Sequence, residues 1–220
     1  MKQTKKVEME VTEPTTTAIA TADDTGSILG EWTKQDIQVP TMKLIQPMSV
    51  TDEDHPNGCY LHDGHIEVCR GEGKRAEVWP LILSKRYELM VPFDSDEPQR
   101  FFSSEAEATA AGYQLGTSDG QVAPFGEIVF LIPVPHEYAH YEFEGQGYAK
   151  TKYTYRKWHF DKAAKVWSVS MNSKKPLWHT TWEIDSQCRK NAKGKHWAPV
   201  LYNKGATPAN MVEWLEAEVI

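Results

Sequence analysis

The sequence predicts a mostly β fold, an OB-like β-barrel with one short internal helix, a C-terminal helix and a disordered N-terminal tail. Three observations favour this class. Most apolar segments are short and are bounded by Gly, Pro, Asn or Asp, which is typical of strands joined by turns. Few segments carry the caps and periodicity of helices. The 220 residues are enough for one hydrophobic core, and they show no internal repeat.

The start of the chain differs in composition from the rest. Residues 1–33 are rich in Thr, Ala, Asp and Glu and hold few large apolar side chains, so we expect a flexible acidic tail. They lack the apolar segment of a signal peptide, and no apolar run in the chain approaches the roughly 18 residues of a membrane span. Three cysteines do not suggest a disulfide framework. We therefore expect a cytoplasmic protein without membrane contact, with a single domain over residues 34–220.

Three apolar segments predict strands in the first part of this domain. They are rich in Val, Ile, Leu and aromatic residues, which favour strands. Pro40 and Pro47 interrupt the first of them, which places it near a sheet edge. The segments are "DIQVPTMKLIQPMSV" (36–50), "AEVWPLILSKRYELMV" (76–91) and "GEIVFLIPV" (126–134).

Two shorter signals lie between these strands. Asp63-Gly64 in "CYLHDGHIEV" predicts a type I′ hairpin, because both residues tolerate positive φ. In "SSEAEATAAGY", Ser104 and Glu107 have the spacing of a capping box and predict the short internal helix.

The second half is predicted as aromatic strands joined by lysine-bearing turns. "TYRKWHF" and "KVWSVSM" on either side of "DKAA" predict one hairpin, and "HTTWEIDSQC" and "HWAPVLY" on either side of "RKNAKGK" predict another. The last segment predicts a helix over residues 207–219, with Thr207 as N-cap and Pro208 in the first turn. Its expected buried stripe is Met211, Val212, Leu215 and Val219.

Charge is unevenly distributed along the chain. The net charge is −7, yet residues 146–205 hold 13 Lys and Arg against three acidic residues, a net +10. The remainder holds 11 basic and 28 acidic residues, a net −17. A polarised chain of this kind can bind a polyanion with one face, although a solvated basic face without a partner would give the same count.

The basic half is also aromatic. Residues 141–202 hold 12 of the 24 aromatic residues. Single-stranded nucleic acid requires this combination, because cations neutralise phosphates and flat rings stack on unpaired bases. The sequence therefore predicts binding of single-stranded DNA without sequence preference.

Strand alternation separates the expected ligand-binding side chains from the expected core. Trp158 and Phe160 are assigned to the core, as are Trp182 with Ile184 and the apolar face of "KVWSVSM", which is Trp167, Val169 and Met171. The expected phosphate contacts are Lys150, Lys152, Lys157, Arg189, Lys190, Lys193 and Lys195. The expected stacking residues are Tyr153, Tyr155 and Trp197. Lys85, Arg86 and Tyr87 are expected to line the same groove.

The order of these segments resembles phage-encoded single-stranded DNA-binding proteins built on an OB-fold. The resemblance covers roughly residues 36–215 and lies in "DIQVPTMKLIQPMS", "GCYLHDG" before "EVWPLILSKRY", "SSEAEATAAG" and "RKNAKGKHWAPVLY". It implies an accessory of DNA replication or recombination that coats single strands and meets other proteins of those pathways. One departure is the end, "VEWLEAEVI", which is acidic but has a helical pattern, whereas bacterial single-strand binders often end in a disordered acidic tip.

The H-E-x-x-H motif of His136, Glu137 and His140 offers an alternative, a zinc-dependent hydrolase. On an α-helix the two imidazoles would share a face and bind zinc. The surrounding sequence does not fit, because prolines and a strand-like segment precede the motif, Gly145 follows it closely and a third ligand is missing. We expect no catalysis and no cofactor.

Cys59, His62, His65 and Cys69 are a second set of zinc-type donors. If Asp63-Gly64 is a two-residue loop, His62 pairs with His65 and Cys59 points to the opposite face. Cys69 then lies about 13 Å from His65 along the strand. This geometry predicts that the four do not share one ion.

A third possibility is a non-enzymatic structural or carbohydrate-binding β-sandwich in which tryptophans stack on sugars. Such a site does not need the basic excess, so salt-insensitive binding would favour it.

Overall fold

Antiparallel strands dominate the computed structural model, which describes residues 39–47, 55–92, 98–191 and 194–220. Val39–Ile220 forms one compact unit by its internal contacts. The expected tail over residues 1–33 and the predicted phosphate contact Lys193 lie outside the described residues. None of the helices in the described ranges has the length and apolarity needed to cross a membrane.

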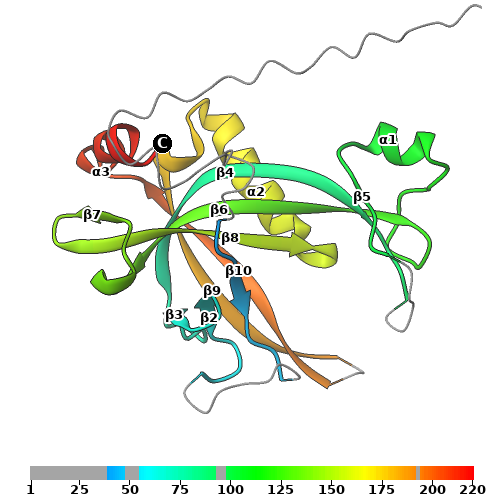
Figure 1. Ribbon diagram of the computed structural model, residues 1–220, viewed down its shortest axis with the longest axis horizontal. Coiled ribbons are helices and arrows are strands. Elements are labelled where there is room, and N and C mark those ends of the chain that lie inside the picture. The colour runs from blue at the N-terminus through cyan, green and yellow to red at the C-terminus, as the bar shows by residue number, and fades with distance from the viewer. Residues whose placement is uncertain (1–38, 48–54, 93–97, 192–193) are drawn as a thin grey trace, which may run out of the picture. The chain divides into compact units, whose positions relative to one another are not determined.

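Ten strands form two antiparallel sheets among these residues (Figure 1). The small sheet has the order β1-β2-β3 and consists of β1 (Met42–Leu44), β2 (Tyr60–His62) and β3 (Ile66–Cys69). The large sheet has the order β10-β9-β4-β6-β8-β7, with β5 paired to β4. Its strands are β4 (Ala76–Leu89), β5 (Phe101–Phe102), β6 (Val122–Val134), β7 (Tyr141–Phe143), β8 (Gln146–Arg156), β9 (Thr180–Asn191) and β10 (Gly194–Ala206). The mostly β class is confirmed, but the strands of the described residues do not close into a barrel.

The long strand β4 joins the two parts of the large sheet. Its first residues, Ala76–Val78, pair with β9, and from Trp79 onward it pairs with β6. The register shifts between Pro80 and Ile82, and bulges of this kind bend a strand and increase its twist. In Figure 1, β9 and β10 accordingly leave the direction of β6 and β8.

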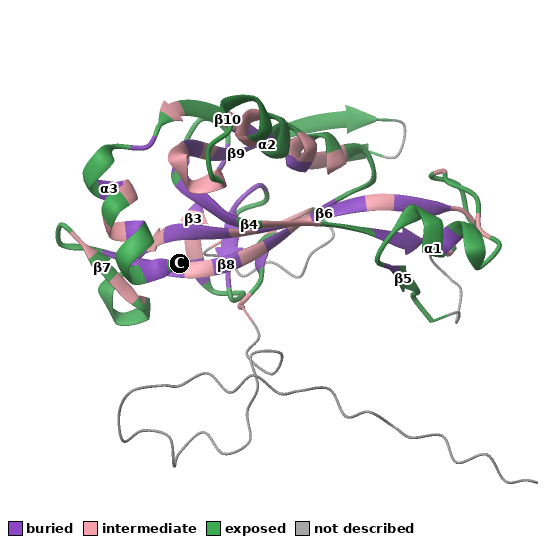
Figure 2. Ribbon diagram, turned by 90° about the horizontal axis from the view of Figure 1, so that it is seen from above, coloured by how far each residue is buried: buried purple, intermediate pink, exposed green. Residues whose placement is uncertain are grey.

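Each helix covers a separate apolar cluster. α2 (Phe160–Ser173) adds Ala163 and Val166 to the main core, which is lined by both parts of the large sheet and by the small sheet. α3 (Ala209–Trp214) continues as a π-helical turn, Leu215–Val219, over the opposite face of β4, β6 and β8. α1 (Glu105–Ala110) covers the far end of β4 and β6. Figures 1 and 2 show α1 and α3 at opposite ends of these strands.

The internal helix has the predicted cap. Ser104 accepts a hydrogen bond from the Glu107 backbone N–H at 3.2 Å. The Glu107 carboxylate bonds the N–H of Ser103 rather than that of Ser104, one residue away from the expected box. The helix boundaries therefore follow from the local sequence, as capping residues dictate.

The C-terminal helix differs from the prediction at its start. Pro208, and not Thr207, occupies the N-cap position. The Thr207 hydroxyl instead donates to the carbonyl of Trp178 at 2.7 Å and lies 3.1 Å from the hydroxyl of Thr181. The predicted stripe is buried at Met211, Leu215 and Val219, and Val212 is half-buried.

The strand predicted from "KVWSVSM" is wrong, because these residues belong to α2. Burial follows a helical spacing, with Ala163 and Val166 facing the core, while Trp167 and Met171 are more than half exposed. The alternation of large and small residues therefore does not reflect two faces of a sheet. α2 ends at Lys174, which adopts a left-handed conformation with φ of 54°.

The β2–β3 hairpin has the predicted turn chemistry but a different register. Asp63 and Gly64 have φ values of 50° and 82°, as a type I′ turn requires. However, His62 pairs with Ile66, so the loop contains three residues and His65 has no strand partner.

Candidate nucleic-acid interface

The face of β8 predicted to bind bases is buried. Tyr153 and Tyr155 are 9% and 1% exposed, and their rings touch edge-to-face within the main core. The prediction that they stack on bases is therefore wrong. Alternation along β8 is present, but the tyrosines take the inner face, where two large rings bury more apolar area than the side chains of Lys152 and Arg156 would.

The lysines on the outer face of β8 already have partners. Lys150 Nζ donates to the carbonyl of Val219 at 2.6 Å, which ties β8 to the C-terminal turn. Lys152 Nζ lies 3.5 Å from the carboxylate of Glu127, and the Nε atom of Arg86 lies 3.9 Å from it. Lys150, Lys152 and Arg86, which were predicted to contact DNA, thus already make polar contacts within the protein.

Two further predicted aromatic contacts are packed against the protein. Tyr87, in β4, is buried in the apolar cluster that α1 covers, and Lys85 lies over its ring at 5.0 Å. Trp197 is half-buried, and its backbone N–H and carbonyl both bond the side-chain amide of Gln46. A Cβ atom at Gly58 would lie 2.4 Å from the Trp197 ring, so the glycine is needed for this close approach. Tyr87 is excluded as a stacking residue, and Trp197 packs against the loop before β2.

A basic cleft of about 370 Å³ lies between the start of α2 and the β9–β10 hairpin. It brings together the predicted cations Arg189 and Lys190 with residues that sequence reasoning did not select. Its lining consists of Trp158, His159, Asp161, Lys162, Arg189, Lys190, His196, Ala198 and Pro199.

Trp158 is the most exposed large apolar side chain of the described residues. Its side chain is 74% exposed, although the sequence predicted it in the core. The cause is local, because Lys157 takes a φ of 51° and starts a 3-10 turn over Lys157–His159, which ends the alternation of β8. An exposed ring beside cations is a feature that single-strand binding surfaces use.

The polar groups of the basic cleft suit an anionic ligand. Asp161 is paired with Lys162 at 2.5 Å, which leaves Arg189 and Lys190 without an acidic partner of their own among the described residues. Burial lowers the pKa of His159, and the neighbouring Lys162 adds to this effect, so the ring is neutral at neutral pH. His196 Nδ1 is buried and makes no hydrogen bond within the described part of the chain.

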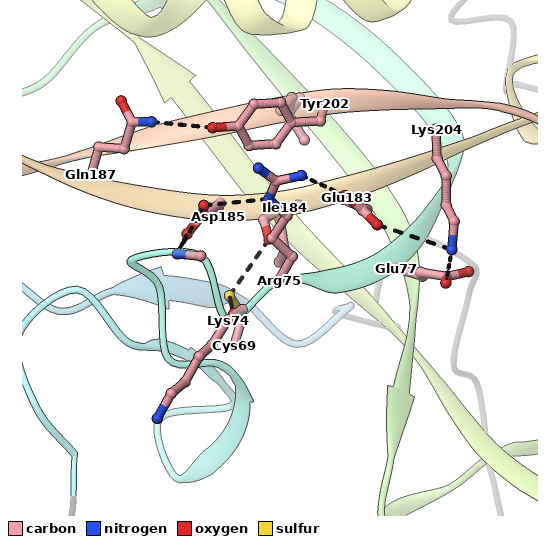
Figure 3. A network of polar contacts seen from close by, with 12 residues as sticks. Cys69, Lys74, Arg75, Glu77, Glu183, Ile184, Asp185, Gln187, Tyr202 and Lys204 are labelled. Carbon is pink, nitrogen blue, oxygen red and sulfur yellow. Dashed lines mark hydrogen bonds and ion pairs between the residues drawn. The ribbon is translucent and has the colours of Figure 1, made fainter.

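The base of the β9–β10 hairpin is held by a network of ion pairs (Figure 3). Arg75 stacks on the ring of Tyr202 at 3.8 Å and pairs with Glu183 at 3.1 Å and with Asp185 at 3.6 Å. Lys204 completes the network through Glu77 and Glu183. The three acidic residues of the basic segment 146–205 are thus all paired: Glu183 and Asp185 with Arg75, and Asp161 with Lys162. They therefore do not neutralise the end of the hairpin.

The end of the hairpin is exposed and basic (Figure 2). Lys195 pairs with Lys190 across the two strands, and His196 pairs with Arg189. The like charges of Lys190 and Lys195 lie directly opposite each other and destabilise the strand pair, so an anion bound at this position would relieve their repulsion.

An apolar groove of about 500 Å³ lies on another side of α2. It is lined by Leu83, Ser84, Lys85, Gly126, Phe160, Ala163, Ala164 and Trp167. Gly126 allows α2 to approach β6, because a Cβ atom there would lie 2.4 Å from that of Ala163. Trp167, which is 51% exposed, gives this groove one free ring but only one cation, Lys85.

Among the described residues, neither of the two candidate metal motifs of the sequence brings its donors together. His136–Tyr138 forms a 3-10 turn, Ala139 is extended, and His136 Nε2 bonds the carbonyl of Gly145, so the two histidines do not share the face of an α-helix. His62 Nδ1 lies 2.9 Å from Thr151 Oγ1, His65 is exposed, and the Cys69 thiol donates to the carbonyl of Lys74.

A different donor cluster is present. His55, Cys59 and Glu67 each place one ligand atom within 4.8 Å of the others. Burial raises the pKa of the Cys59 thiol to about 12, and the nearby Glu67 adds to this shift. Sequence reasoning selected only Cys59 of these three as a metal-type donor. The proximity of Glu67 to Cys59 could not be predicted, because it depends on the register of the β2–β3 hairpin.

Comparison of the chain with protein-family models, with curated proteins and with solved structures found no match.

Proposed function

We propose that this protein binds single-stranded DNA without sequence preference, as an accessory of DNA replication or recombination. The observation that carries the proposal is the basic cleft, in which Trp158 is largely exposed beside Arg189 and Lys190. Exposed rings next to cations are the features that unpaired bases and their phosphates require. The proposal does not need a closed OB barrel, because one helix and one hairpin build the cleft.

The roles follow from the chemistry of the lining. Trp158 stacks on a base, and the His196 imidazole supplies a hydrogen-bonding group that is without a partner in the described structure. The phosphates contact Arg189, Lys190 and Lys162, which line the cleft. They also contact Lys157 and Lys195, which are exposed next to lining residues in the sequence. Five such contacts predict that log K falls with log salt at a slope of about −3.5 for a single strand.

Fluorescence anisotropy of labelled oligothymidine with the full chain, at several salt concentrations, tests this function. We expect saturable binding that weakens steeply with salt and that is similar for a mixed-sequence strand. Absence of binding at low salt would refute the proposal. Binding of an oligosaccharide, insensitive to salt, would instead indicate a carbohydrate-binding protein that uses the exposed tryptophans.

A further inference from the structure

The loop before β2 and strand β3 bring three metal-type donors together. Cys59 directly precedes β2, and Glu67 lies in β3 on the other side of the hairpin. The backbone N–H of Cys59 bonds the carbonyl of Pro56, and its carbonyl accepts a bond from the N–H of Ile45, so the backbone that carries the thiol is held in place. The ligand atoms of His55, Cys59 and Glu67 all lie within 4.8 Å of one another.

An independent observation at His55 points to a metal-binding role. Nδ1 of this ring is buried and has no hydrogen-bond partner within the described residues. The nearby Cys59 thiol is fully buried, and within the described residues it donates only a weak hydrogen bond of 3.6 Å, to the carbonyl of Tyr60. Buried polar groups nearly always have partners, so an unpartnered imidazole nitrogen beside a thiol that is only weakly bonded needs an explanation.

The donor set identifies the class of ion. A thiolate, an imidazole and a carboxylate together suit zinc, whereas magnesium and calcium prefer oxygen ligands alone. Donor atoms around tetrahedral zinc lie roughly 3.3–3.8 Å apart, given bonds of about 2.0–2.3 Å, so side-chain shifts of about 1 Å complete the geometry.

Arg70 fixes the carboxylate without occupying all of it. Its Nε atom lies 2.8 Å and 3.0 Å from the two oxygens of Glu67. Each carboxylate oxygen has a second lone pair that remains for a metal. Hydrogen bonds of this kind typically orient ligating carboxylates in metal sites.

We propose that His55, Cys59 and Glu67 bind one zinc ion, with water in the fourth position. The ion links the loop before β2 to β3. Gly58 lies within this loop and packs against the ring of Trp197, so the ion also braces the contact between the loop and β10. The site is separate from the basic cleft and does not depend on the DNA-binding function.

Cobalt titration of the metal-free full chain tests the site, because a thiolate bound to Co²⁺ gives an intense charge-transfer absorption. We expect one equivalent of Co²⁺ to produce the band and Zn²⁺ to displace it. Cys59→Ser removes the band, whereas the matched control Cys188→Ser, at an exposed cysteine, retains it. No band at one equivalent, or a band that survives in Cys59→Ser, would overturn the proposal.

His55→Gln keeps the test decisive if Cys59→Ser fails to fold, because His55 is only half-buried. Loss of this ligand should weaken Co²⁺ binding by at least about 100-fold, at the upper end of what loss of a supporting residue costs a metal site. The control His65→Gln, in the exposed hairpin loop, should bind as the wild type does. Equal affinity of His55→Gln and wild type, with native circular dichroism, would exclude the site.

Discussion

Replacing Trp158 with alanine is the most direct test of the basic cleft. The side chain is 74% exposed, so its removal should leave the fold intact and affect only what the ring binds. A base stacked on an aromatic side chain contributes about 1–3 kcal/mol. At about 1.4 kcal/mol for each factor of ten, the dissociation constant for oligothymidine should rise by roughly 5- to 150-fold.

The assay is anisotropy of a labelled strand, since it does not depend on tryptophan emission. The matched control is Trp167→Ala, which removes a half-exposed indole from the apolar groove on another side of α2. The salt dependence of Trp158→Ala should match that of the wild type, because the substitution removes no charge. Wild-type affinity in a folded Trp158→Ala protein would refute the role of this ring. A greater loss in Trp167→Ala would move the site to the apolar groove.

Three further outcomes are expected. The double substitution Arg189→Glu and Lys190→Glu should weaken binding of oligothymidine. It should also reduce the magnitude of the salt slope by at least about 1.4, since each lost phosphate contact removes about 0.7. An unchanged slope would exclude the hairpin from the DNA-binding site. Leu215→Ala should lower the free energy of unfolding by about 2–5 kcal/mol in urea titration, because Leu215, in the π-helical turn after α3, is fully buried against the large sheet. Ile220→Ala, at an exposed position, should change it by less than about 0.5 kcal/mol. Burial lowers the pKa of His62 below 6.5, so the folded state favours the neutral ring; stability should be full above pH 6.5 and should fall as the pH drops through the folded-state pKa. His62→Gln should reduce that loss, and an identical pH profile in urea titrations would contradict this assignment.

The sequence was sufficient where local chemistry decides the structure. The cap at Ser104, the positive φ of Asp63 and Gly64, and the buried stripe of the C-terminal helix each depend on a few neighbouring residues. The core positions of Trp182 and Ile184 were also predicted correctly, because both lie in a regular strand with one buried face.

The sequence was insufficient where tertiary packing decides between two patterns. A single strand of alternating Tyr and Lys or Arg side chains does not indicate which face is covered, so Tyr153 and Tyr155 were placed outside. The segment of Trp167 and Met171 alternates like a strand, but it forms a helix that packs closely over Gly126. Trp158 became visible as a ligand-binding side chain only through the backbone change at Lys157.

The edge position of β10 has a consequence for how the cleft should be altered. A long edge strand exposes unpaired backbone groups to which a second copy could add, and proteins guard against this with lysine, proline and bulges. β10 carries all three, in Lys195, Pro199 and the register shift between Asn203 and Gly205. We therefore expect the cations assigned to DNA also to keep the purified protein from aggregating. Neutral substitutions at this hairpin would confuse lost binding with lost solubility, whereas substitutions to glutamate retain the charge that keeps copies apart.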